Sequence, residues 1–286
     1  MQKLPVFFHI PKCAGTYIFN RIFAVCSILG LSDHNKLKRY TIKTCELLKN
    51  GEIAYRIIVR DVKNQCPDLN SFKPVEGNDF FYRVDFNDWL KQKHHFEIRG
   101  LCVQDISFPN FEREKADILN EEKDLCYLTC LREPYDRSVS VFSYLSSSQS
   151  KHENTHEIFG DISFEEYLNS EYLEDSWVIR AFNNIPDSVA ITDDDFYKTI
   201  NILSTMHVFD TSNINESLKS IFKICYNVNV DDYLNLGIYL SVVKNETKEK
   251  INAPFLSLKP DTCRNFLKRT ELDRKLYNNF IDVNIS

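Results

Sequence analysis

Two short apolar runs, each followed at once by a turn and a helical pattern, limit most strongly what this chain can fold into. Residues 6–10 (VFFHI) stop at Pro11, and apolar residues then recur at helical spacing after Thr16, which suits an N-cap. Residues 125–131 (LCYLTCL) lead through REP into YDRSVSVFSYL, which has a helical pattern. Two strand-turn-helix units predict a parallel sheet.

The expected fold class is α/β: a three-layer sandwich with a central parallel sheet, P-loop-like strand-turn-helix units and a helical C-terminal half. Further strands are expected at 53–62, 95–103 and 206–209, and a short helix at 86–92. Helical patterns cover 163–184, 193–206, 213–225 and 269–281. The polar stretch within 146–160 predicts a mobile loop.

Length, composition and charge bear on the number of domains, the partners, the state of the thiols and the location of the protein. With 286 residues and 43% hydrophobic content, the chain suits a single domain spanning 1–286. A net charge of −6 argues against nucleic acid as a partner. The nine cysteines form no CxxC pair, which favours reduced thiols and no metal site. Without a signal-like start or an apolar stretch of about 18 residues, we expect no membrane contact and a cytoplasmic location.

The turn HIPKCAGT has the composition of an anion site. A helix that begins here directs its free amides, at residues 13–17, toward the turn. Gly15 permits close backbone approach, Thr16 adds a hydroxyl donor and Lys12 adds a charge. The lysine precedes the glycine, so this is not a Walker A loop. The simpler alternative is an ordinary strand-to-helix turn with a surface lysine.

FFHIPKCAGT resembles the 5′-phosphosulfate loop of sulfotransferases that use 3′-phosphoadenosine 5′-phosphosulfate (PAPS), particularly the branch of the heparan sulfate 2-O- and 6-O-sulfotransferases. Cys13 stands where threonine is commoner. The resemblance implies PAPS as the donor and 3′,5′-adenosine diphosphate (PAP) as the product. The cofactor-binding residues that it implies are Pro11, Lys12, Cys13, Ala14, Gly15, Thr16 and Tyr17.

The second unit carries a candidate clamp for another phosphate. Arg132 offers a planar fork of donors, and Ser140 adds a hydroxyl two helical turns later. The segment resembles the 3′-phosphate motif of the same family. Alternatively, Arg132 pairs with Glu133 and Ser140 is only a small helix residue. Weaker resemblance in the C-terminal half makes Arg180, Lys244 and Asn245 further candidates for contact with the nucleotide.

The implied reaction is sulfuryl transfer, in which the positive charge of Lys12 stabilises the negative charge that develops on the departing diphosphate. The Gly-His pair of many relatives is replaced by Gly100 and Leu101. The first candidate for the base is Asp105, and His9 is expected to orient the turn. The other candidates are Gln104, His94, His95, His152 and His156.

We expect an enzyme that sulfates a hydroxyl or nitrogen of a soluble small molecule, such as a natural product or a cationic alkaloid. A carbohydrate O-sulfotransferase is the alternative within the family. A Mg²⁺-dependent nucleotide kinase or phosphohydrolase is an alternative of another class. Such an enzyme needs carboxylate ligands for Mg²⁺, and the only acidic cluster of this sequence, residues 193–195 (DDD), also suits a helix cap. A nucleotide-binding protein without catalysis is the third alternative. Oligomeric state is not predicted.

Overall fold

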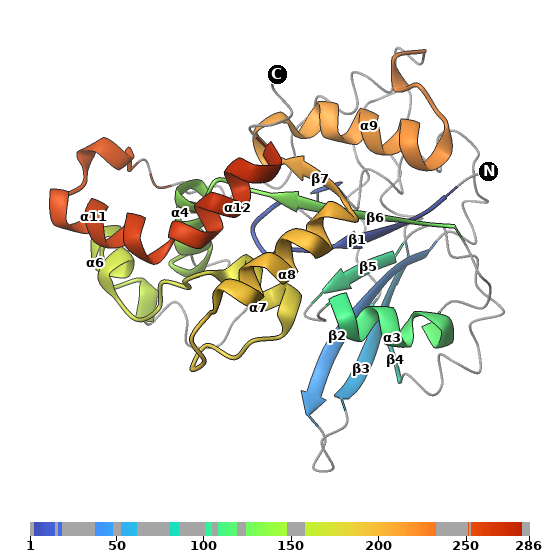
Figure 1. The fold of residues 1–286 in the computed structure, drawn as a ribbon, viewed down its shortest axis with the longest axis horizontal. Helices are drawn as coiled ribbons and strands as arrows, with labels where there is room; N and C mark the ends of the chain where they lie inside the picture. The colour runs from blue at the N-terminus through green and yellow to red at the C-terminus, as the bar shows by residue number, and fades with distance from the viewer. Residues whose placement is uncertain are drawn as a thin grey trace.

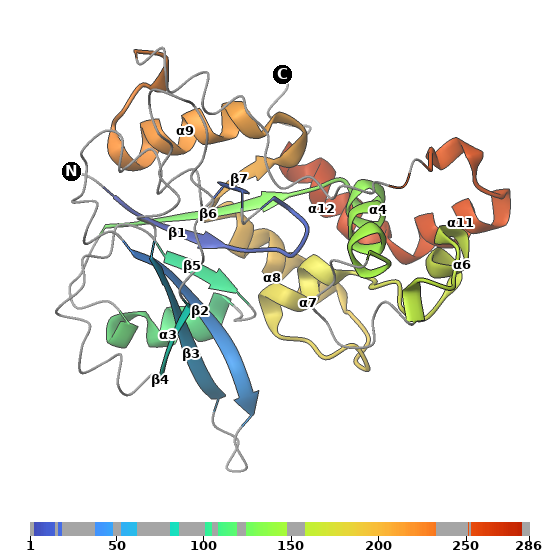
Figure 2. The ribbon, with the colours of Figure 1, turned by 180° about the vertical axis from the view of Figure 1, so that it is seen from behind.

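The fold is mixed α/β and is built around one twisted sheet (Figures 1 and 2). The computed structural model describes residues 3–14, 17–18, 38–47, 53–61, 81–85, 101–104, 108–118, 124–147, 158–232, 251 and 253–281. Within these residues the sheet has the strand order β4-β3-β2-β5-β1-β6-β7. The strands are β1 (Leu4–Phe8), β2 (Lys38–Leu47), β3 (Ile53–Asp61), β4 (Phe81–Asp85), β5 (Leu101–Gln104), β6 (Leu125–Leu131) and β7 (His207–Asp210).

The predicted parallel sheet is confirmed for the strands that flank β1. Strand β1 pairs in parallel with β5 on one side and β6 on the other, so Val6 lies between Leu101 and Tyr127. The pairings of β2 with β5 and of β6 with β7 are parallel as well. Strand β3 instead runs antiparallel to β2, and β4 runs antiparallel to β3. The sheet is therefore mixed rather than wholly parallel.

Both faces of the central strands are covered. Leu4, Val6 and Phe8 of β1 pack into one hydrophobic cluster, whereas Phe7 packs into a second cluster with Leu128. This alternation follows from the two-residue period of a strand. It also explains why β1 and β6 have continuous apolar sequences, since side chains on both faces are removed from water. Each fully buried Phe or Leu contributes about 1.5 to 3 kcal/mol to stability.

Figures 1 and 2 show helix α9 on one side of β1 and β6, and α3, α7 and α8 on the other. The C-terminal helix also packs on the second side, through Leu276. Helices α4, α6 and α11 form a third apolar cluster around Phe142, Tyr167 and Phe266. The helices are α3 (Phe108–Ile118), α4 (Pro134–Leu145), α6 (Phe164–Asn169), α7 (Trp177–Asn183), α8 (Asp193–Ser204), α9 (Ile214–Tyr226), α11 (Pro260–Arg269) and α12 (Glu271–Ile281).

Local capping explains where several helices begin. The Glu133 side chain accepts a hydrogen bond from the Asp136 amide at 3.0 Å and so caps α4, whose first residue is Pro134. Ser163 and Glu166 form a capping box at the start of α6. The pattern predicted as one helix over 163–184 is divided into α6 and α7, because the backbone of Ser170 is extended and Ser176 adopts the left-handed conformation.

The remaining predicted elements agree with the structure within a few residues where it describes them. Strand β6 has the predicted bounds, while β1 begins and ends two residues before the predicted run. The predicted helix at 86–92, residues 95–100 of the third predicted strand and residues 148–157 of the 146–160 loop lie outside the described residues. Among the described helices, none combines the length and the apolar character that crossing a membrane requires.

Candidate functional site

The turn after β1 has an unusual backbone. Lys12 and Ala14 have positive φ angles of 65° and 55°. Each costs about 1 to 2 kcal/mol relative to a right-handed conformation, so surrounding contacts must hold the turn in place. The Cys13 amide donates to the Ile10 carbonyl at 3.1 Å, and the Ile18 amide donates to the Ala14 carbonyl at 3.0 Å. The strand therefore passes directly into a turn and then into the helical residues 17–18.

The Lys12 side chain leaves this turn and reaches the second predicted unit. Its Nζ atom lies 4.2 Å from the centroid of the Tyr144 ring on α4, a distance that suits a cation–π interaction. Burial lowers the pKa of the Lys12 ammonium group, and the nearby positive charge of Arg132 lowers it further. The ammonium group is therefore partly removed from water and lies close to a second cation.

Arg132 joins the two units directly. Its Nη1 atom donates a hydrogen bond to the Lys12 carbonyl at 3.2 Å, although the two residues are 120 positions apart. Deeper in the sheet, Thr129 Oγ1 donates to the Phe8 carbonyl at 2.9 Å. The ends of β1 and β6 are thus tied together at the edge of the sheet where both strands stop.

Ser140 lies on the same face of α4 as Tyr144, because the two residues are four positions apart in one helix. Since Lys12 Nζ lies over the Tyr144 ring, this is the face of α4 that meets the turn. Ser140 is half-buried there. The structure therefore brings Lys12, Arg132 and Ser140, which the sequence predicts as phosphate contacts, to one region. We call these three residues the cationic cluster.

The cationic cluster contains two positive charges, and the described residues place no negative charge beside them. Within the described part of the chain, no carboxylate lies at ion-pair distance from Lys12 or from Arg132. The predicted alternative, in which Arg132 pairs with Glu133, is absent because the Glu133 carboxylate caps α4. Two adjacent cations repel each other, so a bound anion would stabilise both.

The other residues of the turn differ in accessibility. Cys13 is buried, and burial raises the pKa of its thiol to about 11, so the thiol is protonated at neutral pH and is not a nucleophile. The Tyr17 side chain is buried in the cluster that covers the α9 face of the sheet. Pro11 and Ala14 are half-buried. His9 lies at the end of β1, where its amide donates to the Val103 carbonyl at 2.8 Å.

Arg180, a predicted nucleotide contact, is bound within its own segment. Its Nη1 atom donates to the carbonyls of Pro186 and Val189 at 2.7 and 2.8 Å, and its Nη2 atom pairs with Asp175 at 3.1 Å. These bonds attach the loop after α7 to the helix. This arrangement favours a structural role for Arg180, and its contact with the nucleotide stays a prediction.

Several predicted site residues lie outside the described residues, so their roles stay predictions. These residues are Gly15, Thr16, His94, His95, Asp105, His152, His156, Lys244 and Asn245. Asp105 directly follows Gln104, the last residue of β5.

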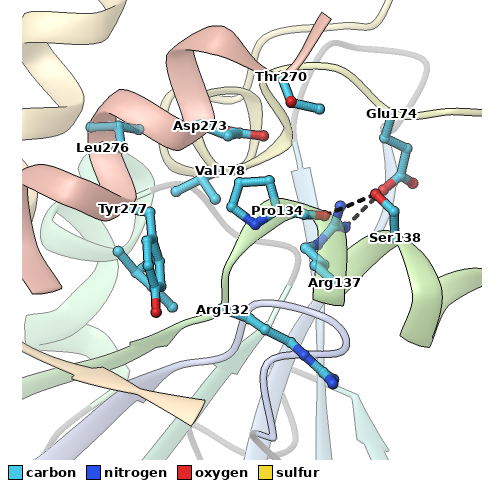
Figure 3. Close-up of a pocket in the computed structure, with 11 residues that line it drawn as sticks. Arg132, Pro134, Arg137, Ser138, Glu174, Val178, Thr270, Asp273, Leu276 and Tyr277 are labelled. Atoms are coloured by element: carbon cyan, nitrogen blue, oxygen red, sulfur yellow. Dashed lines mark hydrogen bonds and ion pairs between the residues drawn. The ribbon is translucent and has the colours of Figure 1, made fainter. Parts of the chain in front are cut away.

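A partly buried charge network supports the start of α4, and the sequence predicts no role for its members (Figure 3). Arg137 Nη2 pairs with Glu174 Oε2 at 2.8 Å, and its guanidinium carbon lies 4.5 Å from the centroid of the Trp177 ring. The wholly buried Asp273 accepts from the Trp177 amide at 3.0 Å, and burial raises the pKa of its carboxyl group to about 6. Figure 3 shows the Arg132 side chain pointing away from this network, although both arginines line the pocket drawn there.

The acidic run 193–195 behaves as a helix cap. Thr192 and Asp195 form a capping box at the start of α8, and Asp194 pairs with Lys198 at 2.7 Å. Among the described residues, no group of three His, Cys, Asp or Glu side chains is arranged to hold a metal ion. The described part of the chain therefore offers no observation that favours the Mg²⁺-dependent alternative.

Comparison of the whole chain with models of known protein families finds no match, and comparison with curated proteins finds none either. The functional argument therefore rests on the residues of this chain and on the geometry of the cationic cluster.

Proposed function

We propose that this protein is a PAPS-dependent sulfotransferase. The observation that carries the proposal is the hydrogen bond from Arg132 to the Lys12 carbonyl, which joins the two predicted phosphate motifs. A nucleotide with phosphates at both its 3′ and 5′ positions requires two neighbouring cationic contacts. The charges of Lys12 and Arg132, which no carboxylate of the described residues balances, suit such a ligand.

The proposal includes the finer architecture that the family implies, namely one domain over residues 1–286, arranged as a three-layer sandwich with P-loop-like units. Helices on both faces of β1 and β6 support this arrangement. So does the position of the cationic cluster at the carboxyl ends of parallel strands, where ligands of open α/β sheets bind.

In the proposed reaction, a bond forms between the acceptor atom and the sulfur of PAPS. The bond from that sulfur to the bridging oxygen breaks, and its electron pair stays with PAP. The ammonium group of Lys12 stabilises the negative charge that develops on that oxygen, since a positive charge already in place stabilises the transition state without reorganisation. Arg132 and Ser140 hold the 3′-phosphate. The acceptor proton passes to a base, for which Asp105 and His95 are the proposed candidates.

The proposed acceptor is a hydroxyl or nitrogen of a small molecule in the cytoplasm. The acidic balance of the chain, with a net charge of −6, disfavours a polyanionic sugar chain and so ranks the carbohydrate alternative second.

Calorimetric titration with PAP in the presence of EDTA tests the proposal. We expect saturable binding that excess EDTA does not weaken, and an Arg132→Met variant that binds more weakly. Release of PAP from PAPS in the presence of an acceptor then tests catalysis. Binding of ATP that requires Mg²⁺, with no binding of PAP, contradicts the proposal and favours a kinase. Binding of PAP without turnover for any acceptor favours a nucleotide-binding protein without catalysis.

A further inference from the structure

A hollow lies beside the turn that follows β1, on the face of the sheet that α7 covers. It has a volume of about 300 Å³, within the lower range of small-molecule sites. Two of its walls come from the ends of β1 and β5, and the others come from α7 and the loop that follows it. Its apolar lining includes Phe8, Ile10, Val103, Trp177, Phe182 and Ile185. We call this hollow the α7 cavity.

The walls of the α7 cavity are held in place by contacts with one another and with residues outside it. The Phe8 ring packs against the rings of Phe108 and Phe182, with centroids 5.4 and 6.1 Å apart. The Trp177 ring is stacked by the guanidinium group of Arg137, which Glu174 anchors in turn. A cavity whose walls are already fixed loses little conformational entropy when it binds a ligand.

The loop after α7 closes one side of the cavity and is fixed in the same way. Arg180 binds the carbonyls of Pro186 and Val189, so the loop is attached to the helix that it follows. The charge of Arg180 is balanced by Asp175 at 3.1 Å. The cavity therefore gains no free cation from this arginine.

The charged residues that line the cavity are Arg180, whose charge Asp175 balances, and Asp187. Asp187 lines the cavity and is exposed, and within the described residues no Lys or Arg pairs with it. The apolar wall and the carboxylate of Asp187 both disfavour an anionic ligand, because its charge would lose water and be repelled. They do not disfavour a neutral aromatic ligand, and the carboxylate attracts a cationic one. The cavity thus differs from the cationic cluster, which suits anions.

The position of the cavity links it to the proposed chemistry. Ile10 lines the cavity and Lys12 follows two residues later, so the segment that follows β1 contributes to both places. The geometry points to the α7 cavity as the site for the apolar body of the sulfuryl acceptor, a small aromatic molecule that is neutral or positively charged. This inference rests on the proposed function, and it adds the substrate class.

The probe for this inference is 2-naphthol, and its anionic counterpart is 2-naphthoate. In the Ala181→Leu variant the larger side chain occupies part of the α7 cavity, because Ala181 lines it. We expect this variant to bind 2-naphthol about tenfold more weakly, with PAP affinity unchanged. Ala190→Leu makes the same substitution at an exposed position outside the cavity and should bind 2-naphthol like the wild type.

A second variant tests the charge of the rim without disturbing the core. Asp187→Lys changes an exposed residue, so its fold should be retained. The wild type should prefer 2-naphthol to 2-naphthoate, and Asp187→Lys should reduce that preference about two- to fivefold.

The outcomes separate this inference from the proposed function. Unsaturable binding of 2-naphthol, or equal affinities in Ala181→Leu and Ala190→Leu, overturns the acceptor site while PAP binding still supports the sulfotransferase. Loss of PAP binding in the wild type overturns the proposed function and, with it, the acceptor role of the cavity. An unchanged preference in Asp187→Lys contradicts the inferred selection against anions.

Discussion

Two pairs of basic residues in this protein have opposite surroundings. Arg137 and Arg180 are each paired with a carboxylate, Glu174 and Asp175 respectively, and both guanidinium groups are mostly removed from water. Lys12 and Arg132 contact each other's segments, but no carboxylate of the described residues pairs with them. A paired cation stabilises the fold, whereas a cation without a partner is available to a ligand. On the proposed function, the difference separates structural charges from binding charges within one motif, since Arg132 and Arg137 are five positions apart.

The largest expected effect breaks the structural pair. In Arg137→Met, Glu174 and the buried Asp273 lose their nearest cation, and we expect the free energy of unfolding to fall by about 3 to 5 kcal/mol. Denaturant unfolding measures this change. Lys198→Met is the matched control, because it removes an exposed ion pair with Asp194 and should leave stability unchanged. Equal stability of the two variants would contradict a structural role for Arg137.

Lys12→Ala tests the binding charges. We expect kcat for release of PAP from PAPS, with 2-naphthol as the acceptor, to fall about 10²- to 10³-fold. The affinity for PAP should fall much less, since the role that we propose for Lys12 lies in the transition state. Lys198→Ala controls for the loss of a lysine elsewhere. Equal losses of turnover and of PAP affinity would show that Lys12 only binds the nucleotide.

Arg132→Met should give the reverse of the Arg137 result. We expect the dissociation constant of PAP to rise about 10- to 100-fold, because a charge-assisted contact with a phosphate is lost. Stability should change little, since Arg132 has no carboxylate partner among the described residues. Calorimetric titration and denaturant unfolding of the same preparation measure both quantities. Unchanged affinity together with reduced stability would place Arg132 among the structural charges.

The smallest expected effect concerns pH. The pKa of Asp273 is raised by burial to about 6 from an ordinary value of 3.8, so between these values the folded state binds more protons than the unfolded state. The free energy of unfolding should therefore decrease as pH rises from about 4 to about 6, by about 1 to 2 kcal/mol from this group.

Asp273→Asn keeps an acceptor for the Trp177 amide and removes the titration, so the variant should show a flatter dependence on pH in that window. Denaturant unfolding at pH 4.5 and pH 7 measures the difference from the wild type. Identical pH dependence in the two proteins would contradict the raised pKa.

Periodicity and capping residues predicted much of the fold. The apolar run at 125–131 has the bounds of β6, and the Pro134 and Asp136 region begins a helix as expected. Strands β2 and β4, which both pair antiparallel with β3, were not predicted. For β2 a signal was present, since Asn50 and Gly51 stand between β2 and β3 and Asn-Gly is typical of a hairpin turn. The single helix predicted over 163–184 was wrong, because periodicity does not reveal the backbone change between Ser170 and Ser176.

In the candidate site, as in the fold, the sequence predicted local features but not the contacts between distant segments. The charges of Lys12 and Arg132 and the hydroxyl of Ser140 could be recognised from motif spacing. Their proximity could not, because 120 residues separate Lys12 from Arg132. Tyr144 could have been found, since its position four residues after Ser140 places both on one helical face. No sequence signal indicates the α7 cavity, whose walls come from three separate segments.

By itself the sequence determined which local units form. Apolar runs specify buried strands, and the residues that follow them specify a turn and a capped helix, because these choices depend on neighbours along the chain. Only the tertiary structure decided which arginine is paired and which is not. That distinction depends on carboxylates brought from distant segments: Glu174 pairs with Arg137, whereas no carboxylate of the segments that the structure describes pairs with Arg132. Such pairing follows from packing rather than from local sequence.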